Sequence, residues 1–211
     1  MTNAAAALLF LSLGCALVDW GAVIAKNKPL QYIFKPATML ALIAAALLVE
    51  PQDPARRAFF VVALIFSLAG DVFLMLPRDR FIFGLATFLI AHAFYILGIK
   101  AEEHHVLPFF FALGAVAAIA VWLLRPVVLS LRARQPKLVT PVIVYASVIA
   151  VMVASAFTSD GLVIAAAGLL FFVSDYLIAR QRFLTENLWQ PVTIMVTYHA
   201  AQALFVFALV A

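Results

Sequence analysis

Two titratable side chains lie inside apolar stretches that are otherwise free of charge. Asp71 lies near the end of one stretch, and His92 lies in the middle of the next. An ionisable residue inside a membrane-spanning segment costs about 3 kcal/mol and is functional by default. A carboxyl group and an imidazole suit general acid–base chemistry, because both exchange protons once their surroundings tune them.

A weaker copy of this pattern follows in the second half of the chain. Asp175 ends one apolar run, and His199 lies inside the next. The order and approximate spacing match those of Asp71 and His92, with a longer loop between the two runs. We therefore predict that these four residues are catalytic and share one interior.

Three roles are open to the four residues. The aspartates could form structural ion pairs, with Lys35 as a partner, and the histidines could be hydrogen-bonded core residues. All four could bind zinc, but no H-x-x-x-H or H-x-x-E-H spacing is present, so we predict no metal and no cofactor. The symmetric placement favours two carboxylates that act as acid and base.

Further polar residues share helix faces with these four, at spacings of three or four positions, or lie near the same ends of the apolar runs. We expect them to bind substrate. They are Asp19, Lys35, Ser67, Tyr95, Ser174, Tyr198 and Gln202.

The composition excludes an ordinary soluble domain. Of the 211 residues, 67% are hydrophobic and only 11% are charged, which indicates an all-α polytopic membrane protein. The net charge of +4 does not indicate nucleic-acid binding, because the basic residues lie in short loops. A single cysteine, Cys15, excludes an intramolecular disulfide.

Apolar windows of about 19 residues predict eight membrane-spanning helices in a single integral membrane domain. The repeated pattern predicts two related four-helix halves, about 1–105 and 106–211. The expected helices are Ala4–Val23, Tyr32–Val49, Ala58–Leu76, Phe81–Ile99, Val106–Leu124, Val139–Phe157, Gly161–Ile178 and Pro191–Val210.

The distribution of Lys and Arg predicts the orientation. Eleven of the fourteen lie after the odd-numbered helices, and Arg56, Arg57 and Lys100 lie on the other side. Cytoplasmic loops are enriched in Lys and Arg, so both termini should be non-cytoplasmic. The expected location is the cell membrane, which is the inner membrane if the protein is bacterial. The aspartates then lie near the mouth of a cavity open to the cytoplasmic leaflet, with the histidines deeper. Residues 102–105 should form a solvated outer turn, and the basic loop 125–138 should bind anionic headgroups.

Several blocks together resemble the YhhN family of membrane proteins, over nearly the whole chain. The blocks are Lys35-Pro36, Ser67-x-x-Gly70-Asp71, Phe83-Gly84-Leu85-x-x-Phe88-x-x-Ala91-His92-x-x-Tyr95, Ser174-Asp175 and Tyr198-His199-x-x-Gln202.

This resemblance implies a lysoplasmalogenase, which hydrolyses the vinyl ether bond of a lysoplasmalogen to a fatty aldehyde and glycerophosphocholine or glycerophosphoethanolamine. The partners would be a lysophospholipid substrate and membrane lipids. Such chemistry requires one protonated acid, one carboxylate and an apolar groove, and Asp71 with Asp175 could supply both charge states. The alternative is a small proton-coupled transporter or lipid translocator that uses the same acids as proton carriers.

Overall fold

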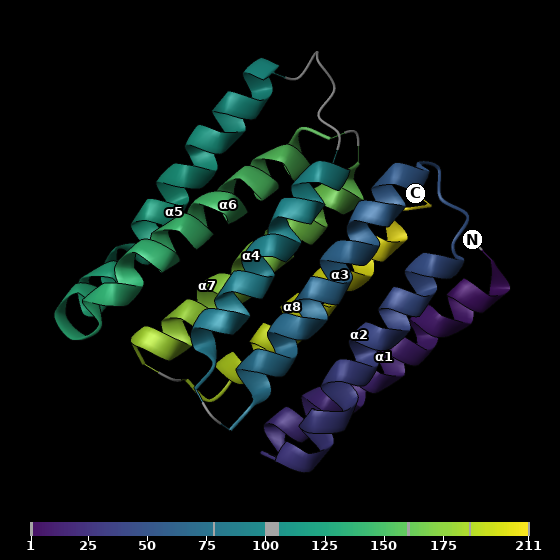
Figure 1. The fold of residues 1–211 in the computed structure, drawn as a ribbon, viewed down its shortest axis with the longest axis horizontal. Coiled ribbons are helices and arrows are strands. Elements are labelled where there is room, and N and C mark those ends of the chain that lie inside the picture. The colour runs from purple at the N-terminus through teal and green to yellow at the C-terminus, as the bar shows by residue number, and fades with distance from the viewer. Residues whose placement is uncertain (1, 78, 100–105, 160, 186, 211) are drawn as a thin grey trace.

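The computed structural model describes residues 2–77, 79–99, 106–159, 161–185 and 187–210. These residues form eight long α-helices and a short 3₁₀ helix, without a strand among them (Figure 1). The predicted turn at 102–105 lies outside the described residues. The helices are α1 (Asn3–Ile24), α2 (Lys28–Leu48), α3 (Pro54–Met75), α4 (Phe81–Gly98), α5 (Val106–Arg134), η2 (Pro136–Leu138), α6 (Val139–Phe157), α7 (Leu162–Phe183) and α8 (Gln190–Phe207).

Helix α2 starts earlier than predicted, so Lys35 has a different position in the helix from the one expected. The Asn27 side chain caps α2 by accepting from the Leu30 amide, and Pro29 fits the first turn, as is usual at helix N-termini. The helix therefore begins at Lys28, four residues before the predicted Tyr32. Lys35, which was expected to begin the helix, lies two turns inside it.

The prediction of a basic loop at 125–138 is wrong. Helix α5 continues to Arg134, and α7 likewise runs to Phe183 instead of ending at Ile178. Basic residues in a last helical turn interact favourably with the helix dipole, and Arg132 and Arg182 occupy such turns. A hydropathy window finds the apolar part of a helix and misses a polar extension of this kind.

Helices that are consecutive in sequence pack as neighbours, in the pairs α1/α2, α3/α4, α5/α6 and α7/α8. Helix α8 lies among the others, in contact with α1, α2, α3 and α7, while α5 lies at the edge against α6, η2 and α7 (Figure 1). The N- and C-terminal ends lie at the same end of the bundle (Figure 1). There Thr2 Oγ1 donates to the Leu48 carbonyl, and the Gln52 amide donates to the Leu209 carbonyl.

Within the described residues, seven helices are long and apolar enough to cross a membrane: α1 to α7. Helix α8 carries polar side chains that include Gln190, Tyr198, His199 and Gln202, all of them buried. Polar residues on a spanning helix face the bundle interior, and α8 contacts more α-helices than any other described helix. Eight spans therefore remain a prediction, which the placement of α8 favours.

The close approach of α3 and α4 depends on glycine. A Cβ atom at Gly70 would lie 2.5 Å from the Phe88 ring, and one at Gly84 would lie 2.7 Å from the Leu74 side chain. Small residues allow helix backbones to approach in this way. Gly70 directly precedes Asp71, so this contact also fixes the carboxylate relative to α4.

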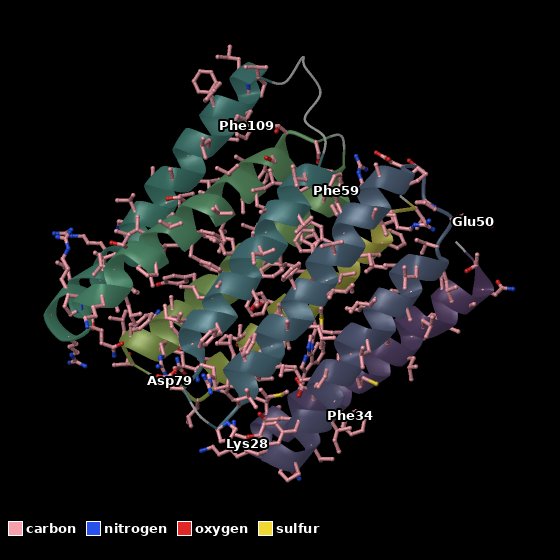
Figure 2. All side chains as sticks on the ribbon, viewed as in Figure 1. Lys28, Phe34, Glu50, Phe59, Asp79 and Phe109 are labelled. Atoms are coloured by element: carbon pink, nitrogen blue, oxygen red, sulfur yellow. The ribbon has the colours of Figure 1, made fainter. Side chains whose placement is uncertain are left out.

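Reporter fusions test the predicted orientation. Figure 2 shows Lys28 and Asp79 near one end of the bundle and Glu50 and Phe59 near the other. Because the basic connections lie at the Lys28 end, we expect a fusion after Ala211 to report the non-cytoplasmic side. An insertion between Arg134 and Pro136 should report the cytoplasm. A cytoplasmic C-terminus would contradict this orientation.

Candidate active site

Asp71 forms the centre of a buried cluster between α2, α3 and α8. Its Oδ1 lies 3.0 Å from Lys35 Nζ, and its Oδ2 accepts a hydrogen bond of 2.7 Å from the Tyr198 hydroxyl. The Asp71 residue is 1% exposed. Two donors, one of them charged, stabilise the carboxylate form at this position.

Asp175 forms a second cluster between α4, α6 and α7. Its Oδ2 accepts from the Tyr145 hydroxyl at 2.9 Å and lies 3.4 Å from His92 Nε2. The His92–Asp175 contact is within ion-pair distance but lacks hydrogen-bond geometry. The other ring nitrogen, His92 Nδ1, lies 2.6 Å from the Phe88 carbonyl, which holds the imidazole in place.

Aromatic rings separate the two clusters. The Phe171 ring lies edge-on to His92, with centroids 4.6 Å apart, and to Tyr198, with centroids 5.5 Å apart. Phe88 packs against both Phe171 and Tyr198. The two carboxylates that the sequence suggested as one pair therefore have separate partners.

Two residues at corresponding positions of the two predicted halves meet farther along α4 and α8. Tyr95, three positions after His92, donates to Gln202, three positions after His199. His199 itself points elsewhere: its Nδ1 accepts from Trp20 Nε1 on α1 at 3.0 Å. This bond places the imidazole proton on Nε2, which is buried without a partner.

The two predicted serines differ in their hydrogen bonding. Ser67 Oγ is buried and has no partner, whereas Ser174 Oγ donates to the Phe171 carbonyl of its own helix. Buried polar atoms are almost always hydrogen-bonded, so exceptions mark places that water or a ligand can fill. Among the described residues the exceptions include Asp19 Oδ1 and Oδ2, Ser67 Oγ, His199 Nε2 and Gln202 Nε2.

Sequence reasoning missed Tyr145 and Trp20. Both are aromatic residues in apolar helices, and aromatic residues are common there without any polar role. Only their contacts with Asp175 and His199 identify them.

A large cavity, of about 690 Å³, opens at the Lys28 end of the bundle. One wall is mainly polar, with Val23 and Ile24 as its apolar members, and comes from α1, α2 and the turn between them. The other wall is mainly apolar and comes from α3, α7, α8 and the segment before α8. The polar wall contains Asp19, Lys26, Lys28, Gln31 and Lys35. The apolar residues include Leu74, Met75, Ile178, Leu188, Val192, Ile194 and Met195.

A small cavity of about 40 Å³ lies beside Asp175 and Tyr145. Leu74 and Ile178 line both this cavity and the large one. These two side chains therefore stand between the large cavity and the Asp175 cluster.

A third cavity, of about 490 Å³, lies beside Asp79 and Arg182. The hydrogen bond from Arg182 holds the pKa of the Asp79 carboxyl below its usual range. Asp79 is therefore charged at neutral pH and unsuited to donate a proton there.

The four predicted catalytic residues do not converge as metal ligands. Asp71 faces Lys35 and Tyr198, and His199 faces Trp20. Within the part of the chain that the structure describes, no three His, Cys, Asp or Glu residues form a group that could hold a metal ion.

The fold and the cavity define a class: an integral membrane protein with ionisable side chains buried beside an amphipathic cavity. The chain belongs to the YhhN family, whose model matches residues 30–209. It is 31% identical over 192 residues to proteins named lysoplasmalogenase from Mycobacterium bovis and Mycobacterium tuberculosis, covering 87% of this chain and 72% of theirs. It is 28% identical over 99 residues to the Escherichia coli O6:H1 protein named uncharacterized membrane protein YhhN, covering 44% of this chain and 46% of that protein. No solved structure is significantly similar.

Proposed function

We propose that this protein hydrolyses the vinyl ether bond of lysoplasmalogens, releasing a fatty aldehyde and a glycerophospho-alcohol. The observation that carries the proposal is the cavity with one polar and one mainly apolar wall, which reaches Lys35 beside Asp71. Its volume lies in the usual range for small-molecule sites. The relatives named lysoplasmalogenase support the same substrate class.

The polar wall suits a phosphate-bearing headgroup. Lys28, Gln31 and Lys35 line the cavity at spacings of three and four positions, so they form one face of α2. Lys28 and Lys35 are about 10 Å apart along the helix axis, so a headgroup phosphate and the vinyl ether can both lie against this face of α2. A phosphate near Lys26 and Lys28 therefore places the vinyl ether near Lys35 and Asp71, with the alkenyl chain against α8.

Hydrolysis starts with proton transfer to the β-carbon and leaves an oxocarbenium ion. We assign the negative charge beside this cation to Asp71, because Lys35 and Tyr198 both stabilise its carboxylate form. We assign proton exchange with the attacking water to Asp175, together with His92. A shift of Leu74 and Ile178 would open the path from the large cavity to Asp175.

The test is product formation by purified protein in detergent. Three lysophosphatidylethanolamines are compared, with an alkenyl, an alkyl or an acyl chain. Aldehyde from the alkenyl substrate alone is the expected result, because only a vinyl ether yields an oxocarbenium ion on protonation. A translocator instead needs a sealed vesicle and forms no product, so lipid movement without aldehyde would favour that alternative.

The absence of a metal requirement is a separate prediction. If a carboxylic acid starts the reaction, EDTA and phenanthroline should leave the turnover of purified enzyme unchanged, within about twofold, because no metal step contributes. Metal content measured on the same sample provides the control. Loss of activity on chelation, with recovery on adding zinc, would contradict the acid mechanism.

A further inference from the structure

Asp19 is a carboxyl group without a hydrogen-bond partner in the interior of the bundle. It lies on α1 and helps to line the large cavity, but its side chain is fully buried, so a turn of the side chain has to bring the carboxyl group to the cavity surface. Both of its oxygens lack partners, whereas Asp71 and Asp175, the other buried aspartates described, each accept from a tyrosine. An ionised carboxylate buried in this way is costly.

The charges around Asp19 indicate its protonation state. Lys35 from α2 lines the same cavity as Asp19 and pairs with Asp71 from α3, and the adjacent Trp20 is bonded to His199 from α8. One lysine and two carboxyl groups are neutral together when one carboxyl keeps its proton. Asp71 has the contacts that stabilise a carboxylate, so the proton belongs on Asp19.

We propose that Asp19 is a further catalytic residue: the acid that delivers the proton to the β-carbon of the vinyl ether. This assignment rests on the proposed function and on the position of Asp19 in the cavity lining that also contains Lys35, the partner of Asp71. Asp19 lies before residues 30–209, the stretch that the family model matches. Its catalytic role is therefore assigned from its position in the structure and not from the family.

The reaction balances with three carboxyl groups. The Asp19 proton bonds to the β-carbon through the electron pair of the double bond, which leaves the α-carbon and ether oxygen as an oxocarbenium ion beside Asp71. Water adds to the α-carbon, and its released proton passes through Asp175 to solvent, while a solvent proton returns to Asp19. The hemiacetal then transfers its hydroxyl proton to the glycerol oxygen as that C–O bond breaks, which gives the aldehyde and the free glycerol hydroxyl.

The test combines kinetics and stability of Asp19→Asn in the full-length protein. We expect kcat to fall at least ~100-fold, the usual contribution of general acid catalysis, with KM nearly unchanged. Wild-type activity should fall at high pH, because the Asp19 acid then loses its proton. The residual activity of Asp19→Asn should not show this fall. Because Asp19 makes no hydrogen bond, its replacement should leave the thermal midpoint in detergent unchanged or raised. Asp19→Glu, which keeps the acid, should stay within about tenfold of wild type.

Asp53→Asn provides the matched control. Asp53 caps α3 at the end of the bundle opposite the cavity mouth, and asparagine caps a helix as well as aspartate does, so full activity is expected. Near-normal kcat in Asp19→Asn would overturn the assignment, and so would a fall in its thermal midpoint or a failure to fold, since either shows a structural role. Inactive wild-type protein would instead refute the proposed function itself.

Discussion

Asp71→Asn is expected to lower kcat at least ~100-fold while the protein remains folded and inserted. The substitution removes the negative charge that faces the oxocarbenium ion, and preorganised charge of this kind is a large catalytic contribution. The amide oxygen of asparagine can still accept from one of the two present donors, because Lys35 lies 3.0 Å from Oδ1 and Tyr198 donates to Oδ2 at 2.7 Å. The measurement is aldehyde release under saturating substrate, with the amount of inserted protein determined for each variant.

Stability separates a catalytic Asp71 from a structural one. Lys35 has only 11% of its side chain exposed, so losing its counter-charge destabilises the fold to some extent. The double variant Asp71→Asn with Lys35→Met removes both charges and should recover the thermal midpoint without recovering turnover. Recovery of turnover in that double variant, or near-normal turnover in Asp71→Asn alone, would show that the Lys35–Asp71 ion pair is structural and not catalytic.

Asp175→Asn is the second variant expected to abolish hydrolysis, again by at least ~100-fold. Asparagine cannot take a proton from water, although it can still accept the hydrogen bond from Tyr145. His92→Gln should have a smaller effect, because His92 contacts Asp175 without a hydrogen bond. Single-turnover measurements should place the Asp175 defect after formation of the oxocarbenium ion.

Tyr145→Phe is the companion variant for this cluster. It removes one hydrogen bond to Asp175 and leaves the carboxyl group, so it should lose less activity than Asp175→Asn. Equal turnover of wild type and Asp175→Asn, with matched expression, would show that the second cluster has no catalytic role.

The buried ionisable residues could be recognised from sequence because they are conspicuous in a membrane. Asp71 and Asp175 stand in runs of apolar residues, and an acid there requires a reason. An aspartate in such a run is expected to face the bundle interior, and both aspartates are buried in the structure. The close approach beside Asp71 was also predictable, because Gly70 is the small residue that it requires.

The partners of these residues could not be predicted, because contacts between distant helices depend on how the helices pack. The spacing of Asp71 and His92 within one predicted half suggested a shared site, yet His92 approaches Asp175 and Tyr198 approaches Asp71. The same limitation explains Ser174, which has the spacing of a site residue but bonds to its own helix.

The depth of Asp175 in its helix also escaped prediction. Arg180 and Arg182 suggested a loop, whereas they form the last turn of α7. Asp175 therefore lies eight residues before the end of the helix, instead of the three expected.

The most direct test of vinyl ether hydrolysis is to run the reaction of purified wild-type protein in D₂O and analyse the products by mass spectrometry. Protonation at carbon predicts a fatty aldehyde with one deuterium on the carbon next to the carbonyl, an equal amount of glycerophosphoethanolamine, and a slower rate than in H₂O. The Asp71→Asn and Asp175→Asn proteins should yield neither product at a comparable rate. No aldehyde from active, folded wild-type protein, or aldehyde without carbon-bound deuterium, would contradict this mechanism.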